Sequence, residues 1–267
     1  MSVVIIGQKK LVKTLESYTL QNVPKTILFL GPEGSGKTWI SVALAEHLEI
    51  DYVHVASDVS AEKLIEYYQC PIPKIYIIDL KDVDERQQNK FLKFIEEPSS
   101  NMYIALSARS EVGILPTILN RCIKFTLEEY TEEELKEFAW CISCEDPRVF
   151  EICKTPGQLN NLPDDNLDEV FTLCDNIVKK LPASNYANTL SLLTKINLKD
   201  SPKKIDFNLF FLVLKYVAFD TYKKTKDKLS LQIYLYTTKR LIETYGRPFS
   251  KESFMLNYLD GLWRLAH

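Results

Sequence analysis

The most constraining feature of the sequence is a glycine-rich octapeptide that follows a short apolar run. Residues 27–30 read Ile-Leu-Phe-Leu, and residues 31–38 read Gly-Pro-Glu-Gly-Ser-Gly-Lys-Thr, the pattern G-x-x-x-x-G-K-T. A buried strand that leads through such a turn into a helix brings backbone N–H groups to the phosphates of a nucleotide. Three of the chain's eight glycines lie in this octapeptide, where positive φ and close ligand approach are tolerated. The chain is therefore predicted to bind a nucleoside triphosphate.

Two side chains of this loop carry most of the predicted chemistry. Lys37 is expected to contact the terminal phosphates, and the Thr38 hydroxyl is expected to bind Mg²⁺. The apolar run 75–78 predicts a buried strand that ends in Asp79, which either holds Mg²⁺ or caps the following turn. The expected cofactors are therefore ATP and Mg²⁺. The residues expected to surround the phosphates are Gly31, Pro32, Glu33, Gly34, Ser35, Gly36, Lys37 and Thr38.

The composition is that of a globular protein that meets its partners through local surfaces. With 46% hydrophobic residues, 26% charged residues and a formal net charge of −3, the chain has no global basic field for nucleic acid. Residues 1–7 lack the features of a secretory signal, and the apolar stretch 207–219 is interrupted by Asn208 and Lys215. We therefore expect a cytoplasmic protein without membrane contact.

The six cysteines are expected to be free thiols in a reducing compartment. Cys141 and Cys144 have the spacing of a zinc-ligand pair, and Cys153 follows them. The next cysteine is Cys174, and the three histidines are distant in the sequence. The pattern does not complete a set of four ligands, so no zinc site is expected.

The hydrophobic pattern divides the chain into an α/β half and a helical half. Up to residue 125, short apolar strands alternate with amphipathic helices, which is typical of a parallel sheet with helical crossovers. Strands are expected at 26–30, 52–55, 75–79, 103–106 and 123–125, and helices at 8–21, 36–47, 61–68 and 85–95. The acidic turn 132–134 opens a set of short helices. Further helices are expected at 167–180, 185–196, 207–223, 229–245 and 251–265.

Two segments after Asp79 carry a more specific signal. Residues 89–98 read Asn-Lys-Phe-Leu-Lys-Phe-Ile-Glu-Glu-Pro, and residues 114–122 read Ile-Leu-Pro-Thr-Ile-Leu-Asn-Arg-Cys. Both resemble signatures of the bacterial AAA+ clamp-loader subunits of DNA polymerase III, the delta-prime and tau/gamma class. Residues 6–8 are similar to the segment that contacts adenine in that family, and residues 155–159 resemble an element of its lid. The resemblance covers residues 5–162.

The resemblance implies a fold and a function for the chain. It implies an AAA+ P-loop nucleotide-binding domain with a parallel sheet over residues 1–127, a helical lid over 128–165 and an all-α collar for oligomerisation over 166–267. As a subunit closest to the delta-prime type, the chain would join a hetero-oligomeric ring of clamp-loader subunits. That ring uses ATP to place a sliding clamp on primer–template DNA during replication. Gly7 and Gln8 would then contact the adenine.

Arg121 is the residue through which the resemblance implies an action on a neighbouring subunit. A surface turn just before the last strand is badly placed for the chain's own phosphates but well placed to reach those of a neighbour. A guanidinium that arrives in trans offsets charge on the γ-phosphate. Without the surrounding motif, a surface arginine paired with a local carboxylate is the simpler interpretation.

Three positions depart from the family pattern. Leu80 follows Asp79 where the family has a glutamate that activates water, and a leucine side chain cannot accept a proton. The residue that senses the γ-phosphate falls at Ser107 or Ala108, and we favour Ser107 because it supplies a hydroxyl. Gln158 replaces the lid arginine and brings no positive charge. Hydrolysis by this chain is therefore expected to be weak, and whether it is an enzyme stays open.

Two other functions are compatible with parts of the pattern. The intact phosphate loop also fits a catalytically active motor subunit of the tau/gamma type. A small-molecule kinase would need an acceptor pocket and a basic lid, which the acidic turn 132–134 and Gln158 disfavour. Lys90 and Lys93, with Arg86, either follow a DNA backbone or form a solvated helix face.

Overall fold

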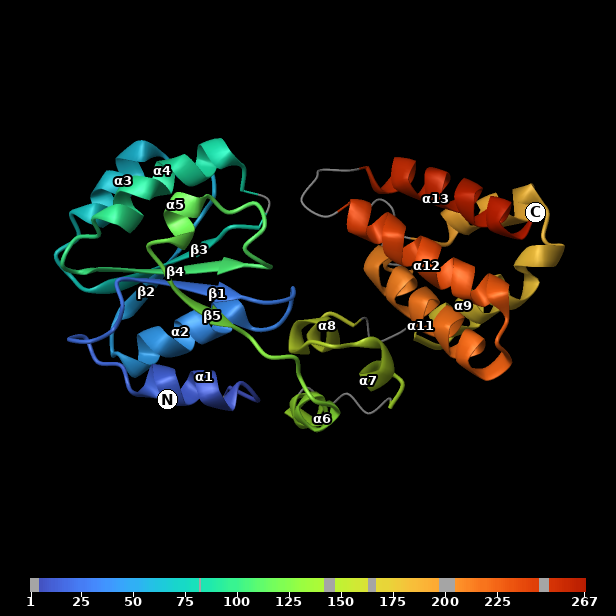
Figure 1. The fold of residues 1–267 in the computed structure, drawn as a ribbon, viewed down its shortest axis with the longest axis horizontal. Helices are drawn as coiled ribbons and strands as arrows, with labels where there is room; N and C mark the ends of the chain where they lie inside the picture. The colour runs from blue at the N-terminus through green and yellow to red at the C-terminus, as the bar shows by residue number, and fades with distance from the viewer. Residues whose placement is uncertain (1–4, 82, 142–146, 163–166, 197–204, 245–249) are drawn as a thin grey trace. The chain divides into compact units, whose positions relative to one another are not determined.

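The computed structural model describes residues 5–81, 83–141, 147–162, 167–196, 205–244 and 250–267. The chain forms two compact units (Figure 1). The first contains residues 1–146 and 154–160, and the second contains residues 147–153 and 161–267. The three-part division at residues 127 and 165 stays a prediction.

The first unit is built on a five-stranded sheet in the order β2-β3-β4-β1-β5. All neighbouring strands are parallel, so their carboxyl ends meet at one edge of the sheet. The strands expected from the sequence are confirmed with small shifts at their ends. They are β1 (Thr26–Leu30), β2 (Asp51–Val55), β3 (Lys74–Asp79), β4 (Met102–Ala108) and β5 (Ile123–Thr126).

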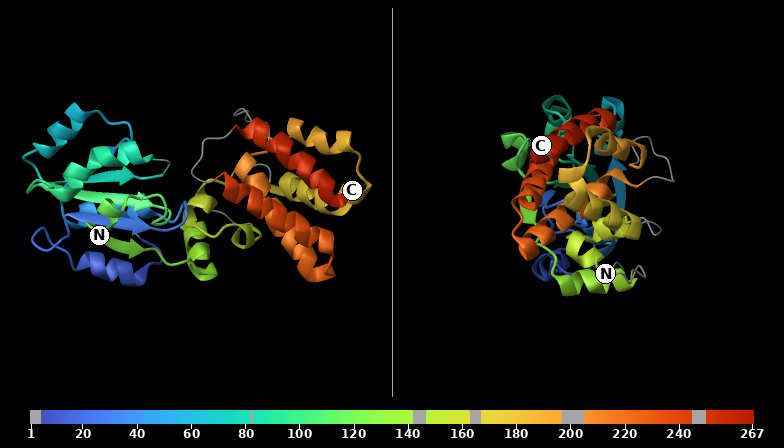
Figure 2. Two further views of the ribbon diagram at one scale, coloured as in Figure 1. Left: turned by 45° about the horizontal axis from the view of Figure 1, so that its top comes forward. Right: turned by 90° about the vertical axis from the view of Figure 1, so that its right-hand side faces the viewer.

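Helices cover both faces of this sheet (Figure 2). Alternate residues of β1 point to opposite faces: Ile27 and Phe29 belong to the apolar cluster with α1 and α2, whereas Leu28 and Leu30 belong to the cluster with α3, α4 and α5. This two-sided burial explains why β1 reads as a continuous apolar run. The helices of this unit are α1 (Lys9–Glu16), α2 (Lys37–His47), α3 (Ala61–Tyr68), α4 (Glu85–Glu96), α5 (Pro116–Leu119), α6 (Glu132–Cys141) and α8 (Pro156–Asn160).

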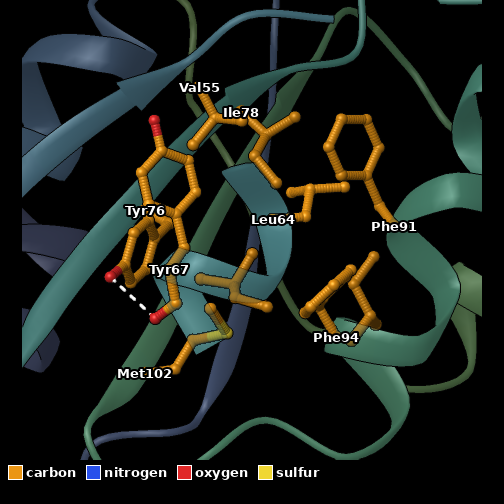
Figure 3. Close-up of a pocket in the computed structure, with 10 residues that line it drawn as sticks. Val55, Leu64, Tyr67, Tyr76, Ile78, Phe91, Phe94 and Met102 are labelled. Carbon is orange, nitrogen blue, oxygen red and sulfur yellow. Dashed lines mark hydrogen bonds between the residues drawn. The ribbon is translucent and has the colours of Figure 1, made fainter. Parts of the chain in front are cut away.

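A small cavity lies in the core between the sheet and helices α3 and α4 (Figure 3). Apolar side chains line most of it, and the Tyr76 hydroxyl donates a hydrogen bond to the carbonyl oxygen of Tyr67 at 3.1 Å. Its volume is about 10 Å³, which is room for one water molecule at most. The cavity is therefore a packing feature of the core and not a ligand site.

The second unit is helical, as expected from the sequence. Its longest helix, α11, packs against α9 and α12, and its buried face includes Phe210 and Phe211. Tyr258 of α13 is fully buried, and its hydroxyl lies 2.6 Å from the Thr237 hydroxyl. The helices are α7 (Val149–Ile152), α9 (Leu167–Lys180), α10 (Tyr186–Leu190), α11 (Phe207–Thr225), α12 (Lys228–Glu243) and α13 (Lys251–Ala266), with 3-10 turns at Leu181–Ala183 and Ser191–Thr194.

The described part of the chain contains neither a candidate membrane span nor a candidate metal-binding cluster. None of the helices in the described part of the chain is both long and apolar enough to cross a bilayer. Among the same residues, no three His, Cys, Asp or Glu side chains are grouped so that they could hold a metal ion.

Candidate nucleotide-binding site

The carboxyl edge of the sheet brings the predicted phosphate loop, Asp79 and Ser107 together. The loop leaves the end of β1, and Asp79 ends β3. In the β3–β4 pairing, Asp79 lies opposite Ser107, and the Ser107 hydroxyl donates a hydrogen bond to Asp79 Oδ1 at 3.1 Å. The sequence left Ser107 and Ala108 open for this position, and Ser107 is the residue whose hydroxyl faces the acidic strand end.

The backbone of the loop has the conformation that its glycines allow. Gly34 and Gly36 have φ values of 77° and 88°, in the left-handed region that other residues avoid. Gly36 precedes α2 and offers no side-chain cap, so the first N–H groups of this helix meet no capping oxygen. A helix start of this kind attracts anions, because its N–H groups and the helix dipole both favour negative charge. The loop therefore has the backbone of a phosphate site.

The Lys37 side chain contacts the first two residues of the loop. Its Nζ donates hydrogen bonds to the carbonyl oxygens of Gly31 at 2.8 Å and Pro32 at 2.7 Å. Burial lowers the pKa of Lys37, and the carboxylates of Asp79 and Glu33 oppose this effect. The ammonium therefore lies within electrostatic reach of Asp79. Thr38, the other predicted Mg²⁺ ligand, is exposed at the start of α2.

Glu33 and Lys81 connect the loop to the end of β3. Lys81 Nζ lies 2.7 Å from Glu33 Oε1, and the Lys81 backbone N–H donates to Asp79 Oδ1 at 3.1 Å. Both side chains of the ion pair are more than half exposed. Exposed ion pairs contribute about 0–1 kcal/mol to stability. A bound ligand can therefore displace the loop from this ion pair at little cost in free energy.

Three successive carbonyl groups of the loop are bound by residues 130 and 155–157. The Tyr130 hydroxyl donates to Ser35 at 2.9 Å, the Thr155 hydroxyl donates to Glu33 at 3.1 Å, and the Gly157 N–H donates to Gly34 at 2.8 Å. The contact at Gly157 is close, because a Cβ atom there would lie 2.5 Å from Gly34 Cα. The start of α8 therefore rests directly on the loop. Tyr130 and Thr155 were not predicted as site residues.

Replacement of Gly157 by alanine is expected to separate α8 from the phosphate loop. The new Cβ would meet the backbone of Gly34, which cannot move aside as a side-chain end can. We expect the free energy of unfolding to fall by about 1–3 kcal/mol, the usual result of overpacking. Amide hydrogen exchange over residues 155–160 should become faster. In the control Gly113→Ala, the new Cβ would meet no atom within 4 Å, so only the local strain of a φ of 85° is added, and exchange over residues 155–160 should not change. Equal exchange in Gly157→Ala and wild type would contradict the contact.

The predicted adenine segment reaches the loop through Tyr130. Gly7 has a φ of 72°, and a Cβ atom there would lie 3.2 Å from Tyr130 Cε1. The Gln8 side chain is buried and forms two hydrogen bonds with the backbone of Glu128, at 2.8 Å and 2.9 Å. These bonds hold residues 7–8 beside the segment that leads into α6. Gly7, Tyr130 and the phosphate loop are thus neighbours.

Two departures from the family pattern have a clear structural expression. The Gln158 side chain accepts a hydrogen bond from the Lys154 backbone N–H at 2.7 Å, so its amide oxygen is bound to the segment just before α8. Leu80 is only 7% exposed and belongs to the apolar cluster with Ile78 and Leu106. Its position holds neither a carboxylate nor a polar surface for an attacking water. Asp82, the nearest carboxylate that could replace the missing glutamate, lies outside the described residues.

Arg121 lies at the amino ends of the strands, whereas the phosphate loop lies at their carboxyl ends. It precedes β5, whose first residue, Ile123, pairs with Ile27 near the start of β1. With a rise of about 3.3 Å per residue, this register puts the Arg121 backbone on the order of 20 Å from Gly31 along the strands. The guanidinium is paired with Glu96 at 3.1 Å and donates to the Thr117 carbonyl oxygen at 2.9 Å. The structure does not bring Arg121 to its own phosphate site.

The exposed face of α4 carries the basic residues singled out in the sequence. Arg86, Lys90 and Lys93 are exposed, whereas Phe91 and Ile95 are buried against the sheet. The three cations therefore share the outer face of one helix. A DNA contact at this face stays a prediction.

These features define the class of protein. A phosphate loop after β1, an acidic end on β3 and a polar residue on β4, in a parallel sheet of order 2-3-4-1-5, are the features of an AAA+ P-loop fold. The comparisons support a narrower statement. Residues 61–131 match the model of a family described as DNA polymerase III, delta subunit. The predicted resemblance to DNA polymerase III clamp-loader subunits is confirmed.

The chain is also similar to individual relatives. It is 28% identical over 169 residues to DNA polymerase III subunit gamma of Buchnera aphidicola, covering 50% of this chain and 47% of that protein. It is 24% identical over 171 residues to the replication factor C small subunit of Archaeoglobus fulgidus, covering 57% and 50%. The chain thus spans about half the length of these curated relatives.

A solved structure supports the fold over nearly the whole chain. The DNA polymerase III gamma subunit-related protein of Thermotoga maritima superposes with a TM-score of 0.53 at 14% identity. The match covers 97% of this chain and 99% of that protein.

Proposed function

We propose that this chain is a subunit of a sliding-clamp loader that binds ATP with Mg²⁺ and acts on a neighbouring subunit through Arg121. The observation that carries the proposal is that the phosphate loop and Arg121 lie at opposite ends of the strands of one sheet. The phosphate loop follows β1, whereas Arg121 precedes β5. In a ring of similar subunits, one edge can receive a nucleotide while the other meets the nucleotide of the next subunit.

The site supports nucleotide binding more strongly than hydrolysis. Lys37, Thr38 and Asp79 supply a cation and two oxygen ligands for ATP and Mg²⁺. Leu80 is buried where a catalytic carboxylate would be needed, and the neutral Gln158 side chain is bound to the Lys154 N–H. Slow turnover by this chain is therefore part of the proposal. The delta-prime type, which acts mainly through its neighbours, fits this combination.

A second candidate is a catalytically active motor of the tau/gamma type. It is favoured by the hydrogen bond between Ser107 and Asp79, which keeps the polar strand ends of an active site together. The similarity to a gamma subunit also supports it. The two candidates differ in ATP turnover by the isolated chain, and the Lys37 variants described in the Discussion distinguish them.

The proposed partners are other clamp-loader subunits, the sliding clamp and primer–template DNA. The test is to mix the purified chain with the loader subunits and the clamp of its own source. We expect a complex whose mass includes this chain, and ATP-dependent clamp loading on primed DNA that fails when the chain is omitted. A chain that stays alone, or loading that proceeds equally without it, would refute the proposal.

A further inference from the structure

Arg109 lies beside the first residue of the phosphate loop. It follows Ala108, the last residue of β4, and Ala108 is the register partner of Leu30 at the end of β1. The Ala108 carbonyl oxygen accepts a hydrogen bond from the Gly31 N–H at 3.2 Å. Neighbouring strands are about 4.8 Å apart, so the Arg109 backbone is about one strand spacing from the loop. The arginine is exposed at the edge where the loop opens.

The charge of Arg109 reaches the centre of the site. Two cationic side chains act electrostatically on the Lys37 ammonium and lower its pKa: Arg109, with the larger effect, and Lys81. Lys81 forms an ion pair with Glu33 at 2.7 Å. Asp79 and Glu33 are the carboxylates that act on Lys37 in the opposite sense. Arg109, which follows the end of β4, is therefore a cation close to the phosphate loop.

The site needs a cation in addition to Lys37. A nucleoside triphosphate bound with Mg²⁺ keeps negative charge on its terminal phosphate that a single lysine does not neutralise. The lid does not provide the missing charge, because Gln158 is neutral and its oxygen accepts the Lys154 N–H. An arginine suits the task, since its planar guanidinium forms paired hydrogen bonds with phosphate oxygens.

We propose that Arg109 binds the terminal phosphate of a nucleoside triphosphate held by its own chain, and thereby makes the site prefer triphosphates to diphosphates. This inference rests on the proposed nucleotide binding. It assigns Arg109 a role in cis that is separate from the role of Arg121 in trans, because the two arginines lie at opposite edges of the sheet. It also assigns the second cation to the residue just after β4 and not to the lid.

The test is a comparison of ATP and ADP affinities for the full chain in the presence of Mg²⁺. Displacement of a fluorescent ATP analogue gives both dissociation constants for wild type, Arg109→Ala and Arg109→Lys. We expect Arg109→Ala to weaken ATP binding about tenfold and to leave ADP binding within about twofold of wild type. Arg109→Lys, which keeps the charge but loses the fork geometry, should give an intermediate ATP affinity.

Arg86→Ala is the matched control, because Arg86 is also an exposed arginine but lies on the outer face of α4. Its ratio of ATP to ADP affinity should equal that of wild type. An unchanged ratio in Arg109→Ala, or the same loss in Arg86→Ala, would overturn the inference while leaving nucleotide binding intact. A wild-type chain that binds neither nucleotide would instead refute the proposed function, and this inference with it.

Discussion

Replacement of Arg121 by alanine is expected to lower ATP turnover by the assembled loader about 100-fold or more, because an arginine supplied in trans contributes a factor of roughly 10³–10⁵ in related phosphoryl-transfer enzymes. Nucleotide binding by the chain itself should not change. Arg121 lies at the edge of the sheet remote from its own phosphate loop, so its loss removes no contact there. The measurement is steady-state turnover of the complex on primed DNA, together with ATP binding by the isolated variant.

The pairing of Arg121 with Glu96 does not oppose this role. Both side chains are about two-fifths exposed, and exposed ion pairs contribute about 0–1 kcal/mol. The guanidinium can therefore leave Glu96 for the more strongly charged phosphate of a neighbour. Glu96→Gln should keep or slightly raise the turnover of the complex. Full turnover in the Arg121→Ala complex would contradict the trans role, and weaker ATP binding by the isolated variant would indicate a role in cis.

The sheet could be predicted well because its strands are buried on both faces. Short, uninterrupted apolar runs such as 27–30 and 75–78 are typical of parallel strands whose two faces are both covered by helices. The helix expected at 8–21 was too long, because a local turn competes with it. Asn22 accepts a hydrogen bond from the Thr19 N–H at 2.6 Å and donates to the Ser17 carbonyl oxygen, and α1 ends at Glu16.

The nucleotide site could be predicted where local sequence decides the geometry. The glycine turn and the acidic strand end are local patterns, and the structure has both of them at the carboxyl ends of the strands. The choice between Ser107 and Ala108 needed the register of β4 against β3, which the sequence does not state. The contact of Tyr130 with the loop was missed for the same reason. Tyr130 contacts Ser35 at a sequence separation of 95, and its only local signal is an aromatic residue next to an acidic helix start.

Replacement of Lys37 by alanine or methionine is expected to weaken ATP binding about 100-fold or more. A lysine in this loop makes charge-assisted hydrogen bonds to phosphate oxygens, each contributing about 1.5–3 kcal/mol, and every 1.4 kcal/mol is about tenfold in affinity. Methionine keeps the apolar stem of Lys37, so equal losses in both variants would assign the effect to the charge. Lys10→Ala is the control, because the Lys10 side chain is 89% exposed and forms an ion pair with Glu128 outside the loop.

The same variants decide between the two candidate functions. With Leu80 buried beside Asp79, the isolated wild-type chain is expected to turn over ATP near background, although it binds ATP. Lys37→Ala would then abolish binding without a measurable change in turnover. Substantial wild-type turnover that Lys37→Ala abolishes and Lys10→Ala preserves would make the chain a motor. Another carboxylate would then have to activate the water in place of the glutamate that is missing at position 80. Wild-type affinity for ATP in both Lys37 variants would show instead that the glycine loop is not the phosphate site.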